Sequence, residues 1–323
     1  MSTSDPPITF AIWCNQLLSS PRLAPPQFRS SSHSVDTDNR PVPSSIGVWD
    51  QFPHYVELWK AEMIACGLSD ARFGAFAEHG TQVFTGSHVP SRVVGSEFET
   101  LAALNDYFEA VNDFNFSFYR FLEPGGQLIE RFNQVYVFGR NTFGMECSPD
   151  IVITDGSQKM TPVGLGEVKT PWFVTSSSCD LFLSELPFHS FGEEFIQALP
   201  PAPAGESASV VHQKELLGAA LVQLYSDLIS AHLSVGFLAT TDAIIYCCIP
   251  AQDRSRFNLC YCKIERSDRT QELEVDGTFM CTPQVGLATL AWLAKRVYSE
   301  RQSKPHGLKR WGTNPLRCFL ICE

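Results

Sequence analysis

Apolar residues recur along the chain with two periods, one typical of helices and one typical of strands. Helical spacing predicts helices over 53–66, 211–233 and 282–301, and a further helix that begins at Ser96. Runs rich in β-branched and aromatic residues predict strands over 134–138, 149–154, 163–170, 235–242, 243–249 and 257–265. The chain is therefore expected to combine helices with strands.

The helix that begins at Ser96 has the clearest start signal. Ser96 and Glu99, three residues later, form a capping-box pattern. We expect this helix to have one apolar face, made by Phe98, Leu101, Leu104, Phe108 and Val111. We interpret the acids around the rest of the helix as a solvated face, made by Glu97, Asp106, Glu109 and Asp113.

The segment 147–172 contains the residues best suited to chemistry. It reads CSPDIVITDGSQKMTPVGLGEVKTPW, in which two strand-like runs flank a turn signal at Asp155. Side chains alternate along a strand, so Glu167 and Lys169 are expected to project from one face. Val168, between them, is expected to point the other way into the core.

If these two strands pair as an antiparallel hairpin, the register determines which residues meet. The polar and turn-forming residues lie over 155–162, so we expect the loop there. Thr154 then lies opposite Val163, and Asp150 lies opposite Glu167. The hairpin would bring two carboxylates together beside a lysine. Such a group suits a hard divalent cation, Mg²⁺ or Mn²⁺.

The order Pro149-Asp150, followed by Glu167-x-Lys169 on the next strand, resembles the motif of the PD-(D/E)XK nuclease superfamily. In that superfamily the Asp, the Glu and the main-chain carbonyl between Glu and Lys bind the metal. The resemblance implies that Asp150, Glu167 and Val168 hold the metal. Lys169 would then be the catalytic lysine. The resemblance also implies a restriction-endonuclease-like core of the α/β (α+β) class, a central mixed sheet flanked by helices.

The helix predicted over 211–233 extends the resemblance. Fungal relatives of the superfamily often have Gln-Leu-Tyr on the helix after the Glu-x-Lys strand, and this helix contains ALVQLYSDLISAHL. The resemblance places Gln223 at the site as a further catalytic residue, and the alternative is a glutamine on a polar helix face. The first helix of such a core can also lend an acid to the metal. Glu109 and Glu130 are both candidates for that acid.

Shifts in composition divide the chain into four parts. Residues 1–45, rich in Ser, Pro and Arg, are predicted to be a disordered tail, and 46–95 a helical extension. The nuclease-like domain is expected over 96–301, followed by a basic tail over 302–323. Within the domain, the long insertion 173–209 is interpreted either as a substrate lid or as a family-specific ornament.

Charge and cysteine usage limit the possible partners. The 323-residue chain has a net charge of −11, which argues against a protein that coats nucleic acid non-specifically but permits a local basic cleft. The 11 cysteines show no regular framework spacing, and we see neither a secretory signal nor an apolar run long enough for a bilayer. We therefore expect an intracellular protein, in the nucleus or the cytoplasm, with no membrane partner. The oligomeric state is left open.

Three functions are compatible with these patterns. The first is a divalent-metal-dependent nuclease that hydrolyses phosphodiester bonds in DNA or RNA. The second is a catalytically degenerate nuclease-like domain that binds a protein or nucleic-acid partner. The third is a structural module in which Glu167 and Lys169 form only an ion pair.

Overall fold

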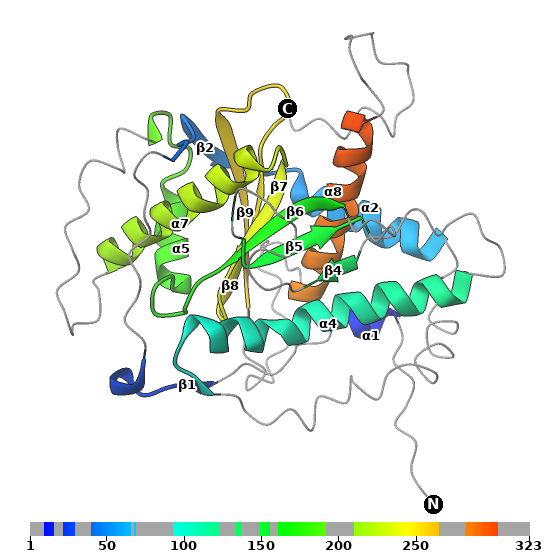
Figure 1. Cartoon of the computed structure of the whole chain (residues 1–323), viewed down its shortest axis with the longest axis horizontal. Helices are drawn as coiled ribbons and strands as arrows, with labels where there is room; N and C mark the ends of the chain where they lie inside the picture. The colour runs from blue at the N-terminus through cyan, green and yellow to red at the C-terminus, as the bar shows by residue number, and fades with distance from the viewer. Residues whose placement is uncertain are drawn as a thin grey trace, which may run out of the picture.

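The computed structural model describes residues 10–15, 22–29, 40–65, 68, 93–122, 134–136, 147, 149–155, 161–191, 210–264 and 282–302. These residues form a seven-stranded mixed sheet flanked by helices, together with a separate sheet of two short strands (Figure 1). The α/β class and the central mixed sheet are therefore confirmed.

The predicted helices and strands appear close to their expected bounds. The helices are α1 (Phe10–Asn15), α2 (Phe52–Ala65), α4 (Glu97–Leu122), α5 (Ser176–Ser184), α7 (Val210–Ser230), α8 (Pro283–Gln302) and the 3-10 turn η1 (Pro26–Phe28). The strands are β1 (Arg22–Leu23), β2 (Ser45–Val48), β3 (Val93–Val94), β4 (Gln134–Tyr136), β5 (Ile151–Thr154), β6 (Pro162–Val168), β7 (Val235–Ala239), β8 (Ala243–Cys248) and β9 (Arg256–Lys263). No helix in the described part of the chain is long and apolar enough to cross a membrane.

The large sheet has the strand order β2-β9-β8-β7-β6-β5-β4. Most neighbouring strands are antiparallel, but β6 and β7 are parallel, as are β2 and β9. Two parallel strands cannot be joined by a tight turn. The chain between β6 and β7 therefore crosses over the sheet, and this crossover contains α5 and α7. As a result, the carboxyl ends of β6 and β7 lie at the same edge.

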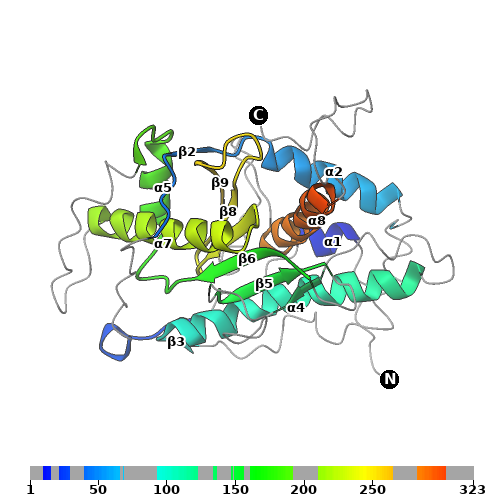
Figure 2. The same cartoon turned by 45° about the horizontal axis from the view of Figure 1, so that its top comes forward.

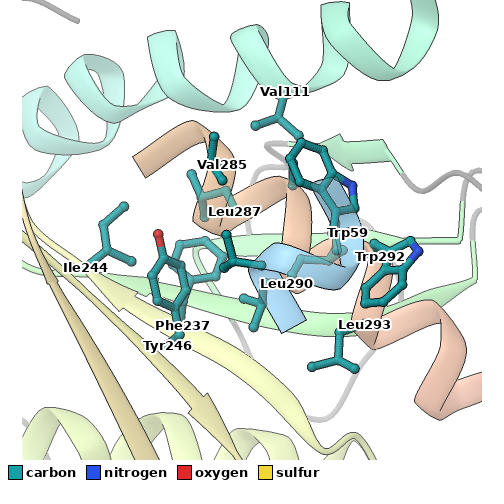
Figure 3. Packing of buried hydrophobic residues seen from close by; sticks show 14 of the residues in the cluster. Trp59, Val111, Phe237, Ile244, Tyr246, Val285, Leu287, Leu290, Trp292 and Leu293 are labelled. Carbon is teal, nitrogen blue, oxygen red and sulfur yellow. The ribbon is translucent and has the colours of Figure 1, made fainter. Parts of the chain in front are cut away.

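Helices cover both faces of this sheet (Figure 2), and each face has its own buried cluster. We call the side covered by α1, α2, α4 and α8 the α8 face, and the side covered by α5 and α7 the α7 face. On the α8 face, aromatic and branched side chains from strands and helices pack together (Figure 3). Val168 belongs to that cluster, as the alternation predicted. Leu165 belongs to the α7 face, so Glu167 and Lys169, of the same parity, point there too.

The start of α4 matches the predicted capping box, except that the Glu99 carboxylate bonds to the amide of Gly95 and not to that of Ser96. The Glu99 amide donates to Ser96 Oγ at 3.2 Å, and the Glu99 carboxylate accepts from the amide of Gly95 at 2.6 Å. Leu104 is buried as expected, but Phe98 is exposed, so its assignment to the apolar face was wrong. At about 100° per residue, Phe98 lies roughly 120° around the helix from Leu104, outside the buried stripe.

The prediction of a disordered tail over 1–45 was wrong for the described residues in that range. Trp13 in α1 is only 1% exposed and stacks on Phe114 of α4 with ring centroids 4.5 Å apart. Two side chains at the start of α8 also bond to α1: Gln284 Nε2 donates to the Trp13 carbonyl and Thr282 Oγ1 donates to the Cys14 carbonyl. The segment is polar on average, but it contains one short helix with large apolar side chains.

Two further boundaries need correction. Residues 46–95 are not a separate helical extension, because β2 pairs with β9 at the edge of the sheet. The insertion 173–209 is not a lid in its described part, because α5 packs on α7 and Phe182 and Phe191 are fully buried. Residues 192–209 and 303–323, like Glu130, lie outside the described part of the chain.

Candidate active site

The hairpin of β5 and β6 has the register expected from the sequence at its functional end. Ile151 pairs with Gly166, and continuing this register by one residue puts Asp150, just before β5, opposite Glu167. At the other end the register shifts after Ile153, so that Thr154 pairs with Pro162. The predicted pairing of Thr154 with Val163 was therefore wrong by one residue. The irregularity lies at the loop end, away from the acids.

Glu167 and Lys169 form a buried ion pair on the α7 face. Their side chains meet at 2.5 Å, and the residues are 3% and 7% exposed. Gln223, from the middle of α7, donates through Nε2 to the same Glu167 oxygen, Oε1, at 2.6 Å. The sequence allowed Gln223 to lie either at the site or on a polar helix face. In the structure Gln223 contacts Glu167.

Asp150 lies just before β5 and is bonded to the end of β6. Its Oδ2 accepts from the Val168 amide at 2.9 Å. In an extended strand the N–H and C=O of one residue point toward the same neighbour, so the Val168 carbonyl also faces the β5 side. Continuing the register puts Pro149 opposite Val168, and proline has no N–H to offer that carbonyl. Pro149 therefore cannot donate a strand hydrogen bond to the Val168 carbonyl. That carbonyl points toward the side on which Asp150 lies.

Burial controls the protonation of the ion pair. Desolvation raises the pKa of Glu167 to about 8, although the neighbouring Lys169 charge acts in the opposite direction. Burial also lowers the pKa of Lys169, but the charge and hydrogen bond of Glu167 outweigh it and the net shift is upward. Burial favours a proton on Glu167, and a cation bound to Glu167 would have to displace that proton.

The sequence analysis missed two residues near this pair, Asp227 and Arg40. Asp227 is buried on α7, one turn after Gln223, and its charge acts on Glu167. Burial raises the pKa of Asp227, while Arg40, with Nη1 3.3 Å from Asp227 Oδ1, opposes that rise. Helical spacing of four residues from Gln223 could have identified Asp227. No local signal links Arg40 to α7, because 187 residues separate Arg40 and Asp227.

The acid that α4 brings toward the pair is Glu97. Its charge acts on Lys169, although the sequence analysis had interpreted it as solvated. Glu109, the candidate chosen from this helix, is twelve residues further along α4, about 18 Å along the helix axis. The side chain of Glu109 is outside the described part of the structure, as is the whole of Glu130.

The site offers a small set of oxygen ligands to a divalent cation. Within the described residues, no three His, Cys, Asp or Glu side chains form a metal-binding group. Mg²⁺ commonly uses only one or two carboxylates and keeps several waters. Asp150 and Glu167, on the same face of adjacent strands, with the Val168 carbonyl between them and no amide from Pro149 to occupy it, fit that requirement.

Comparisons of the chain with protein-family models, with curated proteins and with solved structures gave no match. The functional argument therefore depends on the geometry of this site. Its essential features are a buried Glu–Lys pair, a glutamine bonded to the Glu, and an aspartate bonded to the strand amide between Glu and Lys.

Proposed function

We propose that this protein is a divalent-metal-dependent nuclease of the PD-(D/E)XK type, which hydrolyses phosphodiester bonds in DNA or RNA. One observation carries the proposal: Glu167 contacts Lys169 and Gln223 at the strand end where Asp150 binds the Val168 amide. These groups come from β5, β6 and α7, and they converge on one face of the sheet. A divalent cation, an attacking water and a phosphate require such a convergence of carboxylates, a carbonyl and a fixed positive charge.

Each residue has a defined part in the proposal. Asp150, Glu167 and the Val168 carbonyl would hold Mg²⁺ or Mn²⁺, which supplies a water of lowered pKa and an electrophile for the phosphate. Lys169 would stabilise negative charge on the phosphate oxygens or orient the water. Gln223 fixes the orientation of the Glu167 carboxylate through its hydrogen bond to Oε1.

The position of the ion pair supports a functional role. A buried ion pair loses its hydration, and well-packed apolar residues of similar volume are often as stable or more stable. The surroundings on the α7 face are apolar, with Leu165 and Leu224 fully or nearly fully buried. A purely structural sheet would gain stability by replacing Glu167 and Lys169 with apolar residues, so their presence favours chemistry.

One observation favours a second candidate, a degenerate domain that binds a protein or nucleic-acid partner without cutting it. Glu167 is bonded to both Lys169 and Gln223, and burial raises its pKa to about 8, which favours the protonated form without metal. In a domain that never binds a cation, Glu167 keeps these bonds to Lys169 and Gln223. The two candidates differ in whether a divalent cation binds at Glu167 and displaces its proton.

The decisive experiment for the proposed function is cleavage of labelled oligonucleotides. Single- and double-stranded DNA and RNA are incubated with the purified protein at pH 8 in Mg²⁺, Mn²⁺ or EDTA. Cleavage is expected with either cation and not with EDTA, and Lys169→Met should lower it by at least about 100-fold. A wild-type protein that cuts nothing under any of these conditions contradicts the nuclease proposal and leaves the partner-binding domain.

A further inference from the structure

Large apolar side chains are exposed at one place beside the candidate active site. Among the described residues, five large apolar side chains are exposed, and three of these belong to the segments around the β1–β3 sheet and the start of α4. They are Phe28 at 71% exposed, Val93 at 55% and Phe98 at 78%. We call these three residues, two of which are aromatic, the aromatic patch. Figures 1 and 2 both place the short two-stranded sheet at the amino end of α4.

The backbone around Gly95 holds the patch together. The Phe28 carbonyl lies against Gly95, so closely that a Cβ at Gly95 would be 2.8 Å from it. The Ala24 amide donates to the Val94 carbonyl at 2.7 Å, which ties η1 to the start of α4. A side chain at position 95 would separate the two segments. The sequence therefore fixes Phe28 beside the first turn of α4, which carries Phe98.

The same region is connected to the candidate active site at two points. The Arg29 guanidinium lies over the Trp172 ring, 5.4 Å from its centroid, and Trp172 is three residues after Lys169. Glu97, the neighbour of Phe98, acts on the charge of Lys169. The aromatic patch therefore borders the strand end that carries the proposed chemistry.

We propose that the aromatic patch binds the single-stranded part of a nucleic-acid substrate, with bases stacked on Phe28 and Phe98. This inference rests on the proposed function for the identity of the ligand. Exposed aromatic rings are the usual platform for unpaired bases, and each stacked base contributes substantially to affinity whatever its sequence. In a duplex the base faces are covered by their neighbours, so two separate rings favour an unpaired strand. Arg29 adds a cation suited to a phosphate.

Two acids of the first turn of α4, Glu97 and Glu99, flank Phe98. The Glu99 carboxylate already accepts from the Gly95 amide and the Ser96 hydroxyl. Glu97 is half-buried, and its charge raises the pKa of Lys169. Of the cations whose side chains are described, Arg29 lies against this region, and binding should depend on stacking more than on phosphate charge. A salt slope of roughly −1 in log K against log salt is expected, far below that of proteins that neutralise many phosphates.

The test measures binding separately from cleavage. A fluorescein-labelled single-stranded 12-mer and its matched duplex are titrated with the full-length protein in EDTA, and fluorescence anisotropy is recorded. We expect the single strand to bind at least about tenfold more tightly than the duplex. Phe28→Ala and Phe98→Ala should each lower single-strand affinity roughly 5- to 150-fold, the range for one lost base stack. Phe98→Trp keeps a stacking surface and should retain the affinity.

The control is Ile64→Ala, which removes another exposed apolar side chain, 57% exposed, from α2. Its affinity should equal that of the wild type. Because both phenylalanines are exposed, their substitution leaves no cavity, and unchanged thermal unfolding would confirm intact folding. The inference is overturned by equal affinity for single strand and duplex, by no wild-type binding at 100 µM, or by an unaffected Phe28→Ala/Phe98→Ala variant.

The two proposals fail in different ways. If the alanine variants lose binding but the wild type never cleaves, the nucleic-acid surface stands and the nuclease proposal falls. If the wild type cleaves and the double variant binds and cleaves like it, the nuclease proposal stands and the surface falls. A wild-type dimer in sedimentation that becomes a monomer in the double variant would identify the patch as a self-association surface and would also overturn the inference.

Discussion

The two faces of the central sheet are formed by the same strands but differ in what they bury. Val168 points to the α8 face and belongs to a cluster of aromatic and aliphatic side chains. Phe237 and Leu290 are members of the same cluster (Figure 3). Glu167, the preceding residue, points to the α7 face and meets Lys169 and Gln223 instead. The pleat of one strand therefore separates an apolar core from a charged cluster.

The comparison teaches which residues stabilise the fold and which are available for chemistry. On the α8 face, close packing determines stability, and polar groups are rare among the strand residues. On the α7 face, a charge pair within an apolar cluster lowers the stability that the same volume of hydrocarbon would provide. Substitutions on the α8 face should therefore change stability more than activity. Substitutions in the charged cluster should change activity more than folding.

The largest expected effect is on cleavage by Lys169→Met. This change removes the positive charge but keeps much of the side-chain volume. Nuclease activity should fall by at least about 100-fold, the scale for loss of one preorganised electrostatic group. Since the pair is buried, stability should also change, but protonation of Glu167 limits the cost. Single-turnover cleavage measured well below the midpoint of unfolding separates the two effects, and a variant that cleaves within twofold of wild type would contradict the role of Lys169.

A second prediction tests the opposite face. Leu290→Ala in α8 removes a fully buried side chain from the α8 face, at a site away from the charged cluster. Unfolding should become easier by about 2–5 kcal/mol, as for other large-to-small core substitutions. The fraction that remains folded should cleave at close to the wild-type rate. Denaturant titration combined with cleavage per folded molecule checks this, and a folded variant with no activity would show that the two faces are not functionally separate.

A smaller effect concerns pH. The pKa of Glu167 rises on folding from about 4.5 to about 8, so the folded protein binds this proton more tightly than the unfolded chain. The resulting stabilisation is complete below about pH 4.5 and is lost as the pH rises to about 8. Lys169, Asp150 and Asp227 are the charged groups that act on Glu167.

The matched variant for this pH effect is Glu167→Gln, which removes the titrating group. In EDTA, the melting temperature of the wild type should fall between pH 5 and pH 9 by more than that of the variant. The difference in unfolding free energy between pH 5 and pH 9 should be at most about 4 kcal/mol. Identical pH profiles for the two proteins would show that Glu167 does not titrate in this range.

The parts of this structure that local sequence signals encode were predictable. The pairing of Asp150 with Glu167 follows from strand alternation and turn position, and the helix that carries Gln223 follows from its apolar spacing. The contact between Gln223 and Glu167 required the crossover to be folded onto the α7 face. Sequence spacing alone left that contact undecided.

The remaining features depend on contacts between segments distant in sequence. Arg40 meets Asp227 across 187 residues, and Trp13 is buried only because α4 and α8 are present to cover it. Glu97 was interpreted as solvated because the helix pattern does not show that the first turn of α4 lies near Lys169. Phe98 follows the apolar spacing of the helix, but it lies roughly 120° around the helix from Leu104, outside the buried stripe.

Calorimetric titration of Mn²⁺ into the protein tests the central claim most directly, because the proposed chemistry depends on a cation at the charged cluster. At pH 8 the wild type and Lys169→Met should both bind one Mn²⁺ at millimolar concentration or below. Asp150→Asn should bind it much more weakly, since it loses an anionic oxygen ligand. Binding should weaken as the pH falls below 8, because Mn²⁺ must displace the proton on Glu167. A wild-type protein that binds no divalent cation at millimolar concentration would contradict the account.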